Sequence, residues 1–279
     1  MNSPIRYFGG KGGMYPKILS EFPVGFGLNK VQTSNQGEET YIEPFGGSAS
    51  ILFHKSPSPI EIYNDLDRNV YSLFYVLANK NMFQQFKEKC DVIYFSRQMF
   101  EEYSISLRKD VLSPLERAFR FFYVNRVAYN GVGGFSCIVN CVRRGMSKTI
   151  SDMLSSIERL PEIHQRLSSV IIENKKAIDL LKDHDRPNVF FYLDPPYHHS
   201  TRANARYDID MTNEEQEILI KSLLKVKKAK VLISGYRCKL YNQLSKGGWR
   251  RVDFDVKTQD GNRQSVGKKE SLWRNYKRR

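Results

Sequence analysis

The spacing of hydrophobic and polar positions predicts an α/β protein. Short apolar runs that end at turn or acidic residues are typical of buried strands, whereas apolar positions three or four residues apart are typical of helices. A helix with a capping box is predicted over 213–226. Strands are predicted at 41–43, 60–65, 169–173, 188–194 and 229–236, with an antiparallel edge at 249–258 and 270–276.

The middle of the chain has a different pattern. Helical periodicity dominates it, with a loop and hairpin predicted in NGVGGFSCIVNCVRRGMSKT, because Asn-Gly and Gly-Gly steps favour tight turns. We therefore expect a sheet domain formed by residues 1–68 and 167–279, and an inserted helical domain at 69–166. The predicted helices of the insert are 69–80, 96–109, 113–129 and 151–167.

Composition narrows the class of protein. With 279 residues, of which 41% are hydrophobic, the chain is long enough to bury a full core. It has no apolar run of membrane-spanning length, and MNSPIRYFGG lacks the pattern of a signal peptide, so a cytoplasmic location is expected. The cysteines have no framework spacing, and no second ligand pair follows Cys137 and Cys141, so we expect free thiols and no metal.

The charge of the chain points to a polyanionic partner. Lys and Arg number 44 against 30 Asp and Glu, which gives a formal net charge of +14. The excess is concentrated in CVRRGMSK, KSLLKVKKAK and GNRQSVGKKESLWRNYKRR. A basic surface of this kind supplies affinity for nucleic acid without specifying a sequence.

The segment TYIEPFGGSASILFHK is typical of a strand, a glycine turn and a helix. Glycines at such a turn allow close approach of a ligand to the backbone, although the spacing is not that of a dinucleotide fold. The next strand ends about twenty residues later at Asp65, where an acid often holds a ribose. This pair of features suggests a cofactor that carries a nucleoside; the alternative is that Asp65 caps the following helix.

The stretch FFYLDPPYHH runs a strand into an acid, two prolines and an aromatic ring. The prolines fix the relative positions of Asp194 and Tyr197 at the carboxyl end of a strand, where open α/β sheets bind ligands. This stretch is the candidate catalytic segment.

Six segments together resemble one family. IRYFGGKGGM, IEPFGGSASILF, YNDLD, FYVNRVAYNG, YLDPPY and KKESLWRNY are similar, in this order, to the Dam-type, D12-class, N6-adenine-specific DNA methyltransferases. The resemblance covers nearly the whole chain. It implies a Rossmann-like, seven-stranded, S-adenosylmethionine-dependent methyltransferase sheet with an inserted target-recognition domain, double-stranded DNA as partner, and no obligate protein partner.

The resemblance also implies roles for individual residues. It assigns the catalytic tetrapeptide to Asp194, Pro195 and Tyr197, and the ribose ligand to Asp65. It places Arg126 and Asn130 in the segment that connects the recognition domain to DNA. The basic residues of the hairpin itself, Arg143, Arg144 and Lys148, make it a candidate groove reader; the alternative is that these exposed side chains are only solvated. The expected cofactor contacts are Tyr7, Lys11, Glu43, Phe45, Gly46, Gly47, Ser48, Asp65 and Asp194. One departure is that Lys175 and Lys176 stand where the family often has an aspartate, so no contact is assigned there.

The tetrapeptide suits transfer of a methyl group to adenine N6. That nitrogen is a poor nucleophile because its lone pair is delocalised, and Asp194 with the carbonyl of Pro195 can accept its two hydrogens. The adenine must first flip out of the duplex, and Tyr197 can then stack on it, so phenylalanine at this position is expected to retain most activity. Methylation of cytosine N4 or of adenine in RNA, and a catalytically inactive DNA-binding relative, are the alternatives.

Overall fold

The computed structural model describes residues 1–7, 10–27, 39–131, 133–138, 140–199, 210–259 and 265–277. Parts of the N-terminal IRYFGGKGGM segment and of the basic C-terminal stretch therefore lie outside the described residues. The chain divides into two compact units, each of which is described by itself. Unit 1 comprises Met1–Gly12, Gly47–Phe53 and Asp65–Asn174, and unit 2 comprises Gly13–Gly46, His54–Asn64 and Lys175–Arg279.

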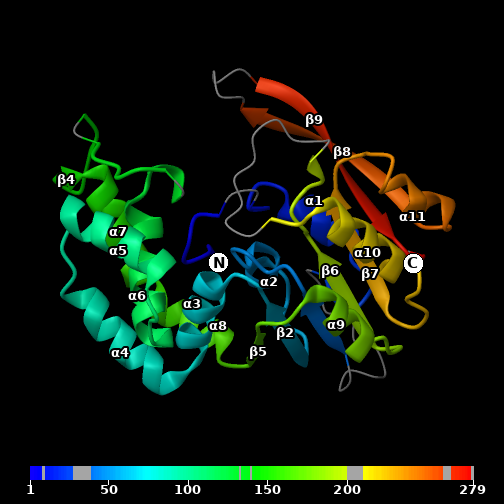
Figure 1. The fold of residues 1–279 in the computed structure, drawn as a ribbon, viewed down its shortest axis with the longest axis horizontal. Helices are drawn as coiled ribbons and strands as arrows, with labels where there is room; N and C mark the ends of the chain where they lie inside the picture. Colours follow the sequence, from blue (N-terminus) through cyan, green and yellow to red (C-terminus); the bar gives the residue numbers. More distant parts are fainter. Residues whose placement is uncertain are drawn as a thin grey trace. The chain divides into compact units, whose positions relative to one another are not determined.

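The described residues form a seven-stranded, mostly parallel sheet (Figure 1) with the strand order β5-β2-β1-β6-β7-β9-β8. The strands β1, β2, β6 and β7 pair in parallel, whereas β7 pairs with β9, and β9 with β8, in antiparallel fashion. This arrangement confirms the predicted Rossmann-like α/β sheet. The strands are β1 Thr40–Glu43, β2 Ile60–Asn64, β5 Val170–Glu173, β6 Val189–Leu193, β7 Lys230–Gly235, β8 Arg250–Gln259 and β9 Ser265–Arg274.

The order of the strands reverses between β1 and β6 in unit 2. The chain runs from β1 outward to β2 on one side, and from β6 outward to β7 on the other. In the parallel register Ile42 is opposite Phe191, so Glu43 at the end of β1 and Asp194 just after β6 lie at the same edge of the sheet. A switch point of this kind is where open α/β sheets bind ligands.

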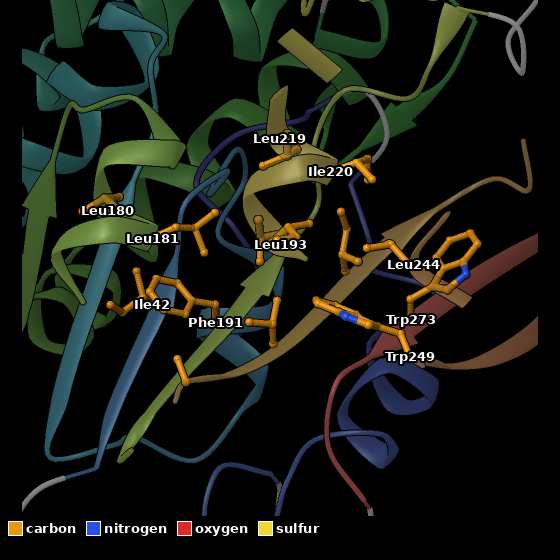
Figure 2. Close-up of a cluster of buried hydrophobic side chains, with 14 of the residues drawn as sticks. Ile42, Leu180, Leu181, Phe191, Leu193, Leu219, Ile220, Leu244, Trp249 and Trp273 are labelled. Carbon is orange, nitrogen blue, oxygen red and sulfur yellow. The ribbon is translucent and has the colours of Figure 1, made fainter. Parts of the chain in front are cut away.

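The core of unit 2 explains why β6 is so apolar. All five residues of β6 are buried, as expected for a central strand covered on both faces. One face packs against leucines and isoleucines of α9, α10 and α11 (Figure 2), whereas Phe190 on the other face contacts Phe22 and Phe26, which follow α1. The helices of unit 2 are α1 Tyr15–Ser20, α9 Ala177–Asp183, α10 Asn213–Leu223 and α11 Asn242–Lys246, and His54 of α2 also falls in this unit.

Unit 1 is mostly helical, and polar caps define where its helices begin. Asp67, Asn79, Ser96 and Ser113 each accept a hydrogen bond from a backbone N–H in the first turn of the helix that follows. The helices are α2 Ser50–His54, α3 Arg68–Ala78, α4 Lys80–Asp91, α5 Arg97–Lys109, α6 Pro114–Val127, the 3-10 turn η1 Tyr129–Gly131, α7 Lys148–Glu158 and α8 Leu160–Leu167, and a hairpin is formed by β3 Val142–Arg143 and β4 Met146–Ser147.

The compact units group the residues differently from the predicted ranges, since unit 1 also takes in the N-terminal segment and Asp65. The division into a sheet domain at 1–68 and 167–279 and an inserted helical domain at 69–166 stays a prediction. Helix α4 was not predicted from the pattern, because its exposed face carries polar residues throughout. Within the described ranges, every helix is too short or too polar to cross a membrane.

Candidate active site and recognition hairpin

Three different elements of unit 2 hold residues 194–197. Ser234 of β7 donates its hydroxyl to Oδ1 of Asp194 at 2.7 Å. Gln216 of α10 donates its amide to the carbonyl of Pro196 at 2.5 Å, and the hydroxyl of Tyr197 donates to Oε1 of Glu270 on β9 at 2.6 Å. The loop after β6 is therefore held at residues 194, 196 and 197, so its polar groups are oriented before any ligand binds.

Tyr197 is more enclosed than a stacking residue needs to be. Its exposed fraction is 9%, and its ring centroid lies 4.5 Å from that of Tyr236. Burial, followed by the charges of Asp194 and Glu270, raises the pKa of Tyr197 well above its ordinary value. The hydroxyl therefore stays protonated and serves as a donor to Glu270, a function that ring stacking alone does not give it.

Gln216 links the loop to the core of unit 2. Its side chain is almost fully buried, and its Oε1 accepts the hydroxyl of Tyr241 at 3.1 Å while its amide donates to Pro196. The Tyr241 ring in turn packs on Trp273, with centroids 5.3 Å apart. The position of the Pro196 carbonyl thus depends on a buried polar network, and such networks are sensitive to the loss of any member.

The glycine turn after β1 is fixed by Asn64 within unit 2. Asn64 is fully buried, its amide donates to the carbonyl of Pro44 at 2.8 Å, and its own carbonyl accepts the N–H of Gly46 at 2.8 Å. A Cβ at Gly46 would overlap the buried Tyr63 ring, so only glycine fits there. Phe45 packs against the core, and Glu43 is buried and accepts the Tyr41 hydroxyl at 2.5 Å.

The other half of the turn lies in unit 1 and is held by Asp65. Its Oδ2 accepts the N–H of Gly47 at 2.7 Å, and its Oδ1 accepts the N–H of Asp67 at 2.8 Å. Burial raises the pKa of Asp65 to about 7, against the backbone hydrogen bonds, which lower it. The cap of helix α3 is Asp67 rather than Asp65, so the alternative reading of Asp65 as a helix cap is wrong.

The N-terminal segment packs onto this turn. A Cβ at Gly47, which has φ +49°, would lie 2.9 Å from the Tyr7 ring, and the carbonyl of Tyr7 accepts the N–H of Gly10 at 3.1 Å. Tyr7 is half-buried, whereas Lys11 and Ser48 are buried. Tyr7, Gly47, Ser48 and Asp65 are thus brought together at one place.

The hairpin residues of unit 1 are paired with acids. Arg143 contacts Asp152 at 3.0 Å, Lys148 contacts the same carboxylate at 2.6 Å, and Arg144 contacts Glu158 at 2.8 Å. About half of each basic side chain remains exposed. These residues are therefore accessible, but an anionic ligand would have to compete with the carboxylates.

Arg126 and Asn130 occupy different environments. Arg126 is 6% exposed and donates to the backbone carbonyl of Asp152 at 3.0 Å, which favours a role in positioning the hairpin. Burial, followed by Arg6 and Arg159, lowers the pKa of its guanidinium to about 10. Asn130 is exposed and has φ +53°, beside the exposed ring of Tyr129. The turn 129–131 therefore presents two side chains to solvent.

A comparison of the sequence with models of protein families shows which family the chain belongs to. The model of the D12 class N6 adenine-specific DNA methyltransferases matches residues 7–263. The chain belongs to this family. The family match confirms the resemblance drawn from the six segments, and it makes DNA adenine the expected substrate of the D12 enzyme. A search of curated proteins found no match.

Several residues of this D12 methyltransferase were missed in the sequence. Glu270 and Asn64 lie inside quoted segments, KKESLWRNY and YNDLD, but nothing in those segments indicates a hydrogen bond to Tyr197 or to Pro44. Gln216 and Ser234 are separated from Asp194 by 20 or more residues, so no local pattern could reveal them. Lys175, where the family often has an acid, uses its backbone N–H to bond Asn64 at 2.7 Å.

Proposed function

We propose that the protein transfers the methyl group of S-adenosylmethionine to N6 of an adenine flipped out of double-stranded DNA, at a specific sequence. The observation that carries this proposal is the arrangement at the switch point of the sheet. Glu43 and Asp194 end neighbouring parallel strands, and the loop 194–197 is fixed by β7, α10 and β9. Methyl transfer to an amino group needs a cofactor site next to oriented hydrogen-bond acceptors, and the acids at the switch point together with the fixed loop fit this requirement.

The residues present fit the cofactor chemically. S-adenosylmethionine carries a cationic sulfonium and a ribose with two hydroxyls, and it supplies an electrophilic methyl group. Buried carboxylates of Glu43 and Asp65, and the half-buried Asp194, suit a cation and a diol. Glycines at 46 and 47, where a side chain would clash, keep the turn open to close approach. We propose as further contacts Tyr7, Lys11, Phe45 and Ser48.

In this proposal the tetrapeptide at residues 194–197 activates the target nitrogen of adenine. Asp194 and the carbonyl of Pro195 would accept the two N6 hydrogens, which localises the lone pair on nitrogen and stabilises the positive charge that develops there. Because Oδ1 of Asp194 is held by Ser234, the carboxylate is oriented before the substrate arrives. Fixed acceptors of this kind cost little reorganisation during the reaction.

Access to an adenine inside a duplex requires base flipping. We propose that Tyr197 provides one face of the pocket for the flipped base. The exposed Tyr129 ring, on a turn whose backbone is tied by hydrogen bonds to residues 133 and 134, would fill the gap left in the duplex. Asn130, Arg143, Arg144 and Lys148 would contact DNA, with Arg126 supporting them from within unit 1.

Methyl transfer to different nucleic acids tests this function. Incubation of the protein with methyl-labelled S-adenosylmethionine should incorporate label into duplex DNA that contains many sequences, and not into RNA of the same sequences. Incorporation into RNA alone would favour the RNA adenine alternative. Binding of duplex DNA without transfer, in folded protein that binds the cofactor, would favour the inactive relative. We place the activity in the cytoplasm, with no obligate protein partner.

Affinity for the cofactor should depend on pH through Asp65. A ribose diol needs the ionised carboxylate as acceptor, and the pKa of Asp65 is raised to about 7, so affinity should rise with pH through neutrality. Between pH 7 and pH 6 the ionised fraction falls about fivefold, and the apparent affinity should fall with it. Calorimetric titration of the wild type and of Asp65→Asn measures this dependence.

The Asp65→Asn variant is the control, because it keeps the shape of the side chain and does not titrate. It should bind the cofactor more weakly by about 1.5–3 kcal/mol at pH 8, the range for a hydrogen bond to a charged group. Its affinity should be nearly constant between pH 6 and pH 8. Equal pH dependence in both proteins would remove Asp65 from the cofactor site.

A further inference from the structure

Asp152 of α7 is shared by three basic side chains of unit 1. Its carboxylate accepts from Arg6 at 3.2 Å, from Arg143 at 3.0 Å and from Lys148 at 2.6 Å. Its side chain is only 13% exposed, whereas the basic partners are 33%, 53% and 45% exposed. One carboxylate cannot neutralise three cations, so each contact is weakened by the presence of the other two.

The three partners come from segments with different functions. Arg143 and Lys148 belong to the recognition hairpin and to the start of the helix that follows it. Arg6 belongs to the N-terminal segment, directly before Tyr7, which packs against Gly47 of the glycine turn. Asp152 is therefore the point where the hairpin and the predicted cofactor segment meet within unit 1.

Hydrogen bonds hold the backbone around Arg6 in place, so a stronger or weaker contact of its side chain is passed on to the N-terminal segment. Oδ1 of Asn125 accepts the N–H of Arg6 at 2.8 Å, and the Asn125 amide donates to the carbonyl of Arg6 at 2.7 Å and to that of Gly131 at 3.3 Å. A Cβ at Gly131 would lie 2.8 Å from the Cβ of Arg6. When the ion pair between Asp152 and the Arg6 side chain becomes stronger or weaker, it therefore acts on a segment that has few alternative positions.

A DNA phosphate would compete with Asp152 for the hairpin cations. Phosphate oxygens are strong acceptors for Arg and Lys, and about half of each hairpin side chain is exposed. When Arg143 and Lys148 turn to phosphate, Asp152 is left to Arg6. The Arg6 contact then becomes stronger, because two competing donors have gone.

We propose that Asp152 couples DNA binding to cofactor binding. DNA removes Arg143 and Lys148 from the carboxylate, the undivided Asp152–Arg6 pair holds the N-terminal segment against the glycine turn, and cofactor affinity rises. Coupling of this kind is reciprocal, so the cofactor raises DNA affinity by the same factor. The inference rests on the proposed function, since it assumes that both ligands bind this chain.

Calorimetric titration with S-adenosylhomocysteine, in the presence and absence of duplex DNA, tests the coupling without turnover. DNA should tighten binding to the wild type by about fivefold or more, the lower range of measured couplings. In Asp152→Asn the factor should fall to about one. Arg6→Gln, which removes the other end of the pair and leaves the hairpin intact, should give the same loss.

Glu158→Gln is the matched control. It also removes one carboxylate that pairs with a hairpin arginine, but its partner Arg144 forms no ion pair with Arg6 among the described residues, where Arg6 pairs with Asp152. This variant should keep the wild-type factor. A wild-type factor of one, or an undiminished factor in folded Asp152→Asn and Arg6→Gln, would overturn the coupling while methyl transfer by the wild type still upheld the proposed function. Absence of transfer by folded wild type would count against the proposed function itself.

Discussion

Replacement of Asp194 by alanine should lower kcat by about 10²–10³-fold, the usual loss when one preorganised electrostatic group is removed from an active site. The carboxylate would accept a hydrogen whose bond strengthens as positive charge develops on N6, so its loss acts on the transition state. DNA affinity should change little, because the acid makes no contribution to phosphate contacts. Single-turnover rates and DNA binding, measured on the same preparation, check both parts.

Ser234→Ala is the matched control for Asp194. It removes the hydrogen bond to Oδ1 but leaves the carboxylate in place. Loss of a neutral donor to a charged acceptor should cost about 1.5–3 kcal/mol at most, so the activity should fall less than in Asp194→Ala. If folded Asp194→Ala protein methylates DNA at the wild-type rate, the catalytic assignment fails. Equal losses in both variants would indicate that orientation, rather than the acid itself, limits the reaction.

Replacement of Tyr197 by phenylalanine should be costly, in contrast to the expectation from sequence. Phenylalanine keeps the stacking face but removes the donor at 2.6 Å from the buried Glu270. Loss of a hydrogen bond to a charged group corresponds to about 1.5–3 kcal/mol, or roughly 10- to 150-fold in kcat if it is expressed in the transition state. Tyr197→Ala also loses about 1–3 kcal/mol of base stacking and should be worse.

Glu270→Gln separates the two functions of the tyrosine. Glutamine retains a neutral acceptor for the Tyr197 hydroxyl at nearly the same place, so this variant should lose less activity than Tyr197→Phe. A fluorescent 2-aminopurine at the target position reports flipping independently of methyl transfer, and it should respond in Tyr197→Phe but weakly in Tyr197→Ala. Wild-type kcat in Tyr197→Phe, with an unchanged melting temperature, would show that the hydroxyl has no part in holding the loop.

The main strands and helices of the fold could be predicted from the sequence because their local patterns agree with the positions they take in the folded protein. The strands next to the candidate residues, the antiparallel edge and the hairpin were all predicted, since alternation, turn residues and caps act over a few positions. The family match and the sheet confirm the resemblance and the fold class. Helix α4 was not predicted because its buried face is narrow, with only Phe86 and Cys90 buried.

The support of the candidate site could not be predicted in the same way. Gln216 contacts Pro196 across 20 residues, Ser234 contacts Asp194 across 40, and Glu270 contacts Tyr197 across 73. Such contacts depend on which strands and helices become neighbours, and single-sequence patterns do not contain that information. The ion pairs of the hairpin with Asp152 and Glu158 were missed for the same reason, since charged residues on a helix pattern indicate only exposure.

The identity of the methylated nucleoside tests the central claim most directly. The wild-type protein is incubated with duplex DNA and S-adenosylmethionine that carries a deuterated methyl group, and the DNA is digested to nucleosides and analysed by mass spectrometry. We predict that the label appears in N6-methyladenine and that its rate of appearance falls by about 10²–10³-fold when Asp194→Ala replaces the wild type. Label in N4-methylcytosine, or no label in any nucleoside with folded protein that binds cofactor and DNA, would contradict the account.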